Sequence, residues 1–178
     1  MARKSLPLSR VYSLLEPGPV VLLVTAEKGR PDIMTQSWHT VIDFEPPLIG
    51  CVVSNRNFSF GLLKKTKECT INIPTADMSA AVVGCGNTSG RKIDKFKAFD
   101  LTLTASSLVK APLIEECYAS LECRVIDTKM ADKYNFFILE VVKAWVDLLK
   151  RNPKTLHHMG KGKFMVSGKT VQLKSRAK

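Results

Sequence analysis

Residues 19–54 read PVVLLVTAEKGRPDIMTQSWHTVIDFEPPLIGCVVS and contain three strand patterns separated by two breaks. The continuous apolar, β-branched run over residues 19–26 predicts the first strand, and Gly29 marks the turn that ends it. We expect the second strand through IMTQSWHTVIDF (33–44), and EPP ends it before the third strand, LIGCVVS (48–54). This stretch therefore predicts a fold that begins with paired strands.

The rest of the chain alternates further strand patterns with short helical ones. Helices are expected at Phe58–Lys67, which carries lysines at its C-terminal end, and from Asp77 as cap to Gly84 as terminator. Strands are expected at CTINIP, at LTLT, in a hairpin formed by CYASLECRVIDTK and NFFILEVVKAWVDLL, and as one or two edge strands in the tail, residues 151–178. Many short strands with few short helices predict an all-β barrel with helical excursions, and the helices are too sparse for a doubly wound sheet.

Composition and apolar run lengths limit the cellular setting. No apolar run approaches the roughly 18 residues of a membrane span, and Met1–Arg10 lacks the apolar stretch of a secretory signal, so we expect a cytoplasmic protein without a membrane anchor. The five cysteines are odd in number, lie mostly among apolar neighbours and form no CxxC motif. They are therefore expected to be buried free thiols, and no metal site is predicted.

The chain carries a formal net charge of +11, which favours an anionic partner. Nucleic acid is one candidate, but the positive residues are spread out, no known reading module is present, and aromatic residues are not interleaved with them. The charge is densest at the end of the chain, in Lys161, Lys163, Lys169, Lys174, Arg176 and Lys178. A phosphorylated cofactor explains a few of the cations equally well, and a solvated basic tail explains the others.

Two polar loops have the composition of a phosphate site. SNRNFS (54–59) falls where the third strand ends and a helix begins, so free backbone N–H groups, two hydroxyls and Arg56 can converge on an anion. The alternative is that Ser54 or Asn57 only caps the helix. NTSGRKIDKF (87–96) places Ser89, Arg91, Lys92 and Lys95 in one loop, and its alternative is a solvated basic loop.

TQSWHT (35–40) is a polar segment with one large aromatic residue inside a strand pattern. Its backbone amides could line a planar ring system, with Trp38 as a wall. Taken alone, however, Trp38 is better interpreted as a core residue on the inward face of the strand.

No nucleophile and base with the partners of a catalytic triad can be identified. His39 could act as a base and Cys85 as a nucleophile, but neither has a partner at a defensible position, so we predict no catalytic side chain. His157 and His158 would point to opposite faces of a strand, so at most one of them faces a site.

Six segments, in this order along the chain, resemble the flavin reductase like family of FMN-binding split barrels. They are TQSWHT, EPPLIGCVVSNRNFS, TINIP, GCGNTSGRKIDKFKAF, APLIEECYASLEC and FFILEVVKAW, and the resemblance spans Leu14 to His158. Its most specific piece, SGRKIDKF (89–96), is similar to the SGRxxDKF signature of the branch that includes flavoredoxin. The resemblance implies a split β-barrel forming one domain over residues 1–178, with its core at 14–158 and a basic tail at 159–178.

The resemblance also implies an FMN site, residue by residue. The isoalloxazine ring would lie against the backbone of Thr35, Gln36, Ser37 and Trp38. The phosphate would be held from Ser54, Asn55, Arg56, Asn57 and Ser59, and Ser89, Arg91 and Lys95 would approach the cofactor. No acid or base is obligatory, because flavin supplies the redox chemistry while the protein binds and orients it.

The implied function is an oxidoreductase that accepts hydride from NADH or NADPH and passes electrons to flavin, a partner oxygenase or another redox protein. The resemblance also implies a homodimer with its FMN sites near the subunit interface. Many relatives carry a His just before the strand matched by FFILEVV, where this chain has Tyr134 and Asn135. An alternative is therefore an FMN-containing electron carrier that does not oxidise NAD(P)H, and a third, resting on charge alone, is a nucleic-acid-binding domain.

Overall fold

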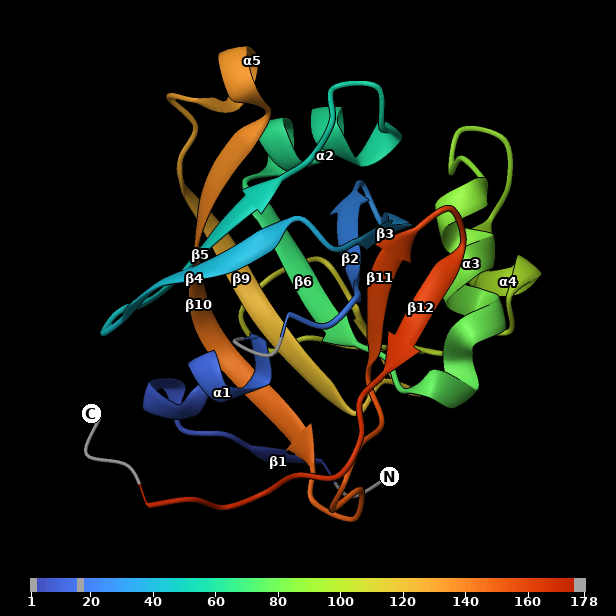
Figure 1. Ribbon diagram of the computed structural model, residues 1–178. Coiled ribbons are helices and arrows are strands. Elements are labelled where there is room, and N and C mark those ends of the chain that lie inside the picture. Colours follow the sequence, from blue (N-terminus) through green and yellow to red (C-terminus); the bar gives the residue numbers. More distant parts are fainter. Residues whose placement is uncertain (1–2, 16–17, 175–178) are drawn as a thin grey trace.

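A computed structural model describes residues 3–15 and 18–174 (Figure 1). Arg176 and Lys178, predicted as part of the basic tail, lie outside the described residues. The main sheet is antiparallel and follows the order β3-β2-β6-β9-β10-β5-β4, with β1 also paired to β10. Its strands are β1 (Arg3–Ser5), β2 (Val21–Glu27), β3 (Arg30–Gln36), β4 (His39–Phe44), β5 (Pro47–Val52), β6 (Glu68–Ile73), β9 (Ala119–Asp127) and β10 (Phe136–Asp147). The predicted split β-barrel with short helical excursions is confirmed.

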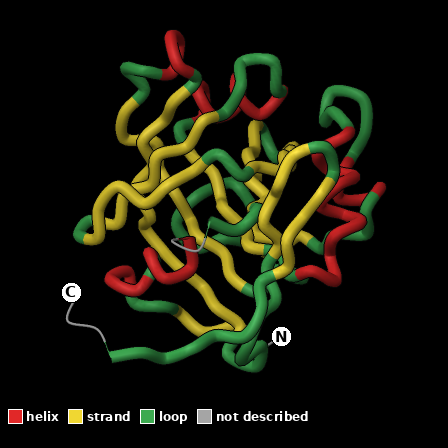
Figure 2. The backbone as a smooth tube through the Cα atoms, in the orientation of Figure 1, coloured by secondary structure: helices red, strands yellow, loops and turns green. Residues whose placement is uncertain are grey.

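The sheet curves into an incomplete barrel because β3 and β4 are its two ends yet follow one another in the chain. Only Ser37 and Trp38 separate them, so the two ends must meet at this point (Figure 2). The prediction of one strand over residues 33–44 was wrong. The Trp38 carbonyl accepts the Gln36 side-chain amide (2.6 Å) and the Val52 N–H (2.9 Å), so the chain leaves the β2–β3 ladder and pairs with β5 instead.

Two apolar layers hold the barrel. The inner layer fills the barrel with side chains such as Leu23, Ile71 and Phe137, none of which is exposed to solvent. The outer layer packs Leu22, Val24 and other side chains against the helices. Because β2 contributes to both layers, its continuous apolar sequence reflects burial on both faces.

The helices cover the barrel and carry the loops of interest. They are α1 (Tyr12–Leu15), α2 (Phe58–Thr66), α3 (Ser79–Asn87), α4 (Lys95–Ala98) and α5 (Ala131–Tyr134), with 3-10 turns at Leu8–Arg10 and Ala76–Met78. The helix predicted from Asp77 to Gly84 begins later and continues three residues further. Gly84 lies inside α3 and does not end it. The lack of a side chain at Gly84 lets the Phe99 ring approach the helix backbone, where a Cβ would overlap the ring.

Two small hairpins complete the fold. β7 (Leu103–Thr104) pairs with β8 (Leu113–Ile114), and β11 (Leu156–Gly160) pairs with β12 (Lys163–Val166). The β11–β12 hairpin does not extend the main sheet as an edge, as the tail was expected to do. It is a separate sheet, anchored by the Val20 N–H, which donates to the Leu156 carbonyl (2.7 Å). No helix among the described residues is long and apolar enough to cross a membrane.

Candidate functional site

Three hollows converge on the C-terminal end of β3, and Thr35 lines all of them. The first, called here the loop pocket, has a volume of about 120 Å³ and lies between the Arg56–Ser59 loop and the Thr88–Lys95 loop. The second, the strand-end pocket, has about 330 Å³ and lies beside Gln36, Ser37 and Trp38. The third, the hairpin pocket, has about 270 Å³ and lies between α3 and the β11–β12 hairpin.

The loop before α2 is shaped by its own backbone contacts. The Asn55 N–H donates to Asn135 Oδ1 (3.1 Å), and the Arg56 N–H donates to Ser54 Oγ (3.3 Å). Asn57 occupies the N-cap position of α2 without making a side-chain capping bond. The interpretation of Ser54 or Asn57 as a simple helix cap is therefore not supported, and the start of α2 can accept an anion.

A buried charged cluster forms the floor of the loop pocket. The Ser59 hydroxyl donates to Asp32 Oδ2 (2.6 Å), while Lys95 Nζ donates to the carbonyls of Ile33 (2.6 Å) and Cys85 (2.9 Å). Burial lowers the pKa of Lys95. The other carboxylate oxygen of Asp32 is buried without a hydrogen-bond partner among the described residues.

Asp32 was missed by the sequence reasoning, because an acidic residue after a turn normally indicates only a solvated strand end. Gly90 belongs to the same floor. A Cβ at Gly90 would overlap the Asp32 carboxylate, so the Ser89–Arg91 turn approaches this closely only with glycine at its centre.

The second loop contributes two further predicted residues in different ways. Ser89 lines the loop pocket and accepts the Arg91 N–H at 3.4 Å. The Arg91 guanidinium carbon lies 5.6 Å from the centre of the Phe58 ring, so its side chain packs across the outside of the other loop. The two loops are thus in contact.

At the junction of β3 and β4, the Gln36 side chain is buried and the Trp38 side chain is exposed. The Gln36 amide is used internally, donating to the Trp38 carbonyl and pairing with His39 Nδ1 (2.8 Å). Trp38 is 72% exposed, so its interpretation as a core residue was wrong. Trp38 instead lies between β3 and β4, the two ends of the sheet, where the buried inner layer of the barrel does not cover its side chain.

The two side chains that could have acted as base or nucleophile have strongly shifted pKa values. Burial lowers the pKa of His39 to about 4, and burial raises the pKa of the Cys85 thiol to about 11. Both groups are therefore uncharged near neutral pH, and the Cys85 thiol is a weak nucleophile.

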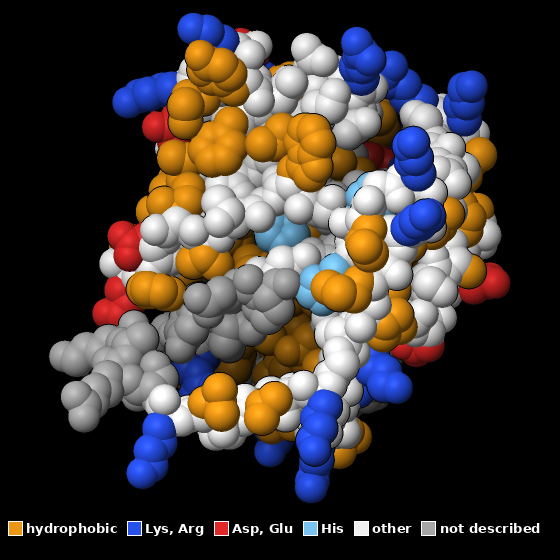
Figure 3. All heavy atoms as spheres, viewed as in Figure 1, with side chains coloured by type: hydrophobic (Ala, Val, Ile, Leu, Met, Phe, Trp, Pro, Cys, Tyr) orange, Lys and Arg blue, Asp and Glu red, His pale blue; other side chains and the backbone are white. Residues whose placement is uncertain are grey.

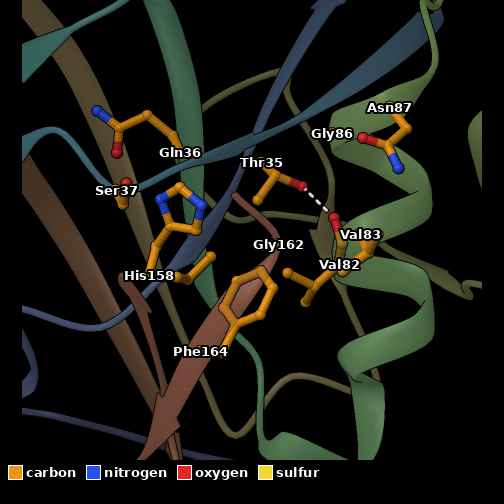
Figure 4. A pocket seen from close by; sticks show the side chains of 11 residues that line it. Thr35, Gln36, Ser37, Val82, Val83, Gly86, Asn87, His158, Gly162 and Phe164 are labelled. Carbon is orange, nitrogen blue, oxygen red and sulfur yellow. Dashed lines mark hydrogen bonds between the residues drawn. The ribbon is translucent and has the colours of Figure 1, made fainter. Parts of the chain in front are cut away.

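The hairpin places one histidine in the site. His158 lines both the strand-end pocket and the hairpin pocket (Figure 4). His157 Nε2 instead lies 3.0 Å from Thr155 Oγ1. This agrees with the expectation that at most one of them faces a site. His158 could not be chosen from sequence, because it lies more than a hundred residues from Ser37 and reaches it only through the hairpin.

Most predicted site residues are brought together. The loop pocket includes Arg56, Asn57, Ser59, Ser89 and Lys95, and the strand-end pocket includes Gln36, Ser37, Trp38, Ser54 and Asn57, with Thr35 in both. Asn55 and Arg91 line none of the three hollows. Among the described residues, no three His, Cys, Asp or Glu side chains gather in a way that could hold a metal ion.

Comparison with known proteins gives consistent relatives. The uncharacterized protein YddH of Escherichia coli is 32% identical over 174 residues, covering 89% of this chain and 91% of YddH. A solved FMN-binding domain of a flavin reductase-like enzyme from Shewanella baltica superposes with a TM-score of 0.92 at 22% identity, covering 97% of this chain and 98% of that domain. Flavoredoxin from Methanosarcina acetivorans superposes with a TM-score of 0.76 at 26% identity, covering 89% of each chain.

The family description "Flavin reductase like domain" matches residues 14–165, which is most of the chain and includes all three hollows. The sequence resemblance is thereby confirmed. This chain belongs to the flavin reductase like domain family.

Proposed function

We propose that this protein is an FMN-dependent oxidoreductase, which accepts hydride from NADH or NADPH and passes the electrons to flavin or to a partner acceptor. FMN is the cofactor supported by the family and by its FMN-binding structural neighbours. The observation that carries the proposal is the adjacency of two unlike hollows. A small polar pocket with Arg56 and Lys95 lies next to a larger pocket lined by residues 35–38.

These two hollows match the two ends of FMN. Met34, Thr35 and Asn57 line both, so one ligand can extend from one to the other. Two cations, the Ser89 hydroxyl and the backbone N–H groups at the start of α2 suit a phosphate dianion, although the Asp32 carboxylate offsets part of that positive charge. The residues present therefore fit the cofactor: Arg56, Asn57 and Ser89 offer side chains to the phosphate, Ser59 offers its backbone N–H, and buried Lys95 adds positive charge.

Bound flavin supplies the capacity to accept a hydride and release electrons. The chain itself binds and orients the flavin. His39 and Cys85 are uncharged near neutral pH, and the residues lining the strand-end pocket include no pair of side chains that could act as acid and base. The strand-end pocket is open, which leaves room for a nicotinamide to stack on a ring held against residues 35–38.

Oxidation of NADH and NADPH, followed at 340 nm with and without FMN, tests the proposal. We expect FMN-dependent oxidation of one or both nucleotides by the purified protein. Absence of oxidation of either nucleotide with FMN bound would contradict the reductase function while leaving FMN binding intact.

A second candidate is an electron carrier that receives electrons from another protein. This candidate is supported by the residues just before β10, where many relatives carry a His and this chain has Tyr134 and Asn135. Here Asn135 has a left-handed backbone (φ 58°), which asparagine tolerates, and its side chain accepts the Asn55 N–H. Asn135 thus holds the phosphate-side loop and offers no imidazole. In stopped-flow mixing, a carrier would stay oxidised with excess NAD(P)H and be reduced by a reduced ferredoxin-type donor.

Arg56 provides a direct test of the phosphate site. We expect Arg56→Ala to weaken FMN binding by about 1.5–3 kcal/mol, or roughly tenfold to more than a hundredfold, because it removes a charge-assisted contact. Quenching of FMN fluorescence measures the affinity. Lys95→Ala is a less clean test, since it also deprives the Ile33 and Cys85 carbonyls of their donor.

Three controls separate a phosphate contact from general damage. Riboflavin lacks the phosphate, so its affinity should change less than twofold in Arg56→Ala. Arg151→Ala, at another exposed arginine, should leave both affinities unchanged. Trp38→Ala should weaken FMN and riboflavin equally through a lost ring contact. FMN affinity within twofold of the parent in Arg56→Ala would show that the loop pocket does not hold the phosphate.

The chain is also proposed to act as a homodimer. Apolar side chains gather over β4, β5 and α5 in the upper left of Figure 3, and the exposed fractions of Ile42, Phe44 and Tyr134 are 46%, 48% and 57%. β4 is also an end of the main sheet. A second copy would cover this face and approach the strand-end pocket next to Trp38.

We expect Ile42→Lys to raise the dimer dissociation constant by at least about a hundredfold, since a charge would be buried in the apolar interface. Light scattering over a concentration series measures this. Leu103→Lys is the matched control, because Leu103 is 47% exposed but lies on β7, away from β4. Equal mass for wild type and Ile42→Lys would exclude β4 from the interface.

A cytoplasmic location remains part of the proposal. All five cysteines are buried and free, as suits a reducing compartment. A partner oxygenase or redox protein is proposed as one acceptor, consistent with the similarity to nitrilotriacetate monooxygenase component B from Bacillus cereus. The whole chain is proposed to serve as one domain.

A further inference from the structure

The hairpin pocket has the dimensions and walls of a site for a small flat molecule. Its volume of about 270 Å³ is below the roughly 300–1,000 Å³ typical of sites for drug-sized ligands. Val82 and Val83 of α3 form one side, and Phe164 of β12 faces them (Figure 4). The pocket is thus too small for a whole FMN molecule but suits a single substituted ring.

Free polar groups lie beside these apolar walls. The Thr35 hydroxyl donates to the Val82 carbonyl (2.5 Å) and the Gln36 amide is used within the β3–β4 segment, so neither is available to a ligand. The His158 ring and the Asn87 amide, by contrast, have no hydrogen-bond partner among the residues that the structure describes. His158 also packs on Phe164, with ring centres 5.3 Å apart, which fixes the imidazole at the edge of the pocket.

The electrostatic surroundings favour an anion. No acidic side chain lines the pocket. Gly162, which does line it, is flanked at the tip of the hairpin by Lys161 and Lys163, and both lysines are exposed. A ligand entering past this tip therefore meets positive charge at the rim and apolar walls inside.

We propose that the hairpin pocket binds a planar aromatic carboxylate, with the ring between Phe164 and the α3 valines and the carboxylate hydrogen-bonded by His158 and Asn87. A flat ring uses the facing apolar walls, and a carboxylate satisfies the free donors and the lysine rim. The existence of this site does not depend on FMN. Its position beside Ser37, next to the flavin ring, rests on the proposed function.

Benzoate is the probe, and the histidine ring protons provide the readout. The chain contains three histidines, so the Cε1 proton resonances are few, and His157→Gln and His158→Gln assign them. In a proton NMR titration of wild-type protein, benzoate should shift the His158 resonance saturably while the His157 resonance stays in place. His157 is the matched neighbour, since it faces away and is paired with Thr155.

Ligand and protein variants test each part of the site. Benzamide has the same shape without the charge and cyclohexanecarboxylate has the charge without planarity, so each should bind at least about fivefold more weakly than benzoate. His158→Ala should weaken benzoate about tenfold, and His157→Ala less than twofold. Val83→Trp should fill the pocket and abolish binding, and because Val83 is 37% exposed this variant should fold.

Repeating the titration with saturating FMN distinguishes this proposal from the proposed function. The hairpin pocket shares Thr35, Gln36, Ser37 and His158 with the strand-end pocket, but Val82, Val83, Asn87 and Phe164 line the hairpin pocket alone. Because the benzoate ring is placed among these unshared residues, we expect its affinity to change less than twofold. Loss of benzoate binding when FMN is present would assign the hairpin pocket to the flavin ring and overturn the proposal, as would equal affinity for benzamide or an unshifted His158 resonance. If the protein does not bind FMN, the proposed function fails, while the titration of the free protein still decides whether the pocket binds benzoate.

Discussion

Replacing Glu122 with alanine is expected to lower the free energy of unfolding by about 3–5 kcal/mol. Glu122 is fully buried on β9 and accepts hydrogen bonds from the Trp145 indole (2.8 Å), the Ser107 N–H (2.9 Å) and the Leu108 N–H (2.6 Å). Its removal would leave three donors unsatisfied and release the loop before β8. Urea unfolding measures the loss.

Two further variants test whether the loss of the Glu122 hydrogen bonds, and not the loss of a carboxylate as such, lowers the stability. Glu122→Gln keeps one carbonyl oxygen and should cost less than the alanine variant. Glu140→Ala, on the adjacent β10, removes a half-exposed glutamate and should change stability by less than about 0.5 kcal/mol. Faster amide exchange at Ser107 and Leu108 should accompany Glu122→Ala. A loss below about 1 kcal/mol for that variant would contradict a structural role for the network.

Stability should also fall as the pH is lowered from about 6.5 to about 4, because of His39. Burial lowers the pKa of folded His39 from 6.5 to about 4, so within this window the unfolded chain binds a proton that the folded chain does not. The neutral His39 ring therefore contributes stability above pH 6.5, the pKa of this group in the unfolded chain, and that stability is lost as the pH falls towards 4. At about 1.4 kcal/mol per pH unit, the loss approaches about 3 kcal/mol.

Carboxylates also titrate during acidification, so the comparison must be made against His39→Asn. This variant should be less stable than wild type at pH 7 because the contact between Gln36 and His39 changes, and it should lose less stability between pH 6.5 and 4. His157→Asn should keep the wild-type dependence. Parallel stability profiles for wild type and His39→Asn would show that the buried ring does not govern this window.

Much of the fold could be predicted from short-range patterns. Apolar, β-branched runs predicted the strands β2, β5, β6, β9 and β10. The lysines at the C-terminal end of α2 helped to predict that helix, because residue alternation and helix-end charges are both local properties. The SNRNFS and NTSGRKIDKF segments were predicted as polar loops from residue type, and the structure brings these loops into contact at the loop pocket. That they hold the FMN phosphate stays a prediction.

The failures occurred where distant contacts overrode local pattern. Residues 33–44 have a continuous strand pattern, yet the chain breaks at Ser37 because Gln36 and Val52 both bond the Trp38 carbonyl. Trp38 has the size and apolarity of a core residue but lies at the split of the barrel. The α3 helix continues past Gly84, and this glycine instead makes room for the Phe99 ring, a contact that the local pattern does not reveal.

The sequence by itself determined most of the strands, the two polar loops and the family, because these depend on residue types at short spacing. Only the tertiary structure decided which charged and polar groups from distant segments of the chain lie next to one another. It buried Lys95 on two carbonyls, left one Asp32 oxygen without a partner beside the loop pocket, and brought His158 to Ser37. The physical reason is that closing the barrel at Ser37 and Trp38 sets these distances, and no local pattern encodes that closure.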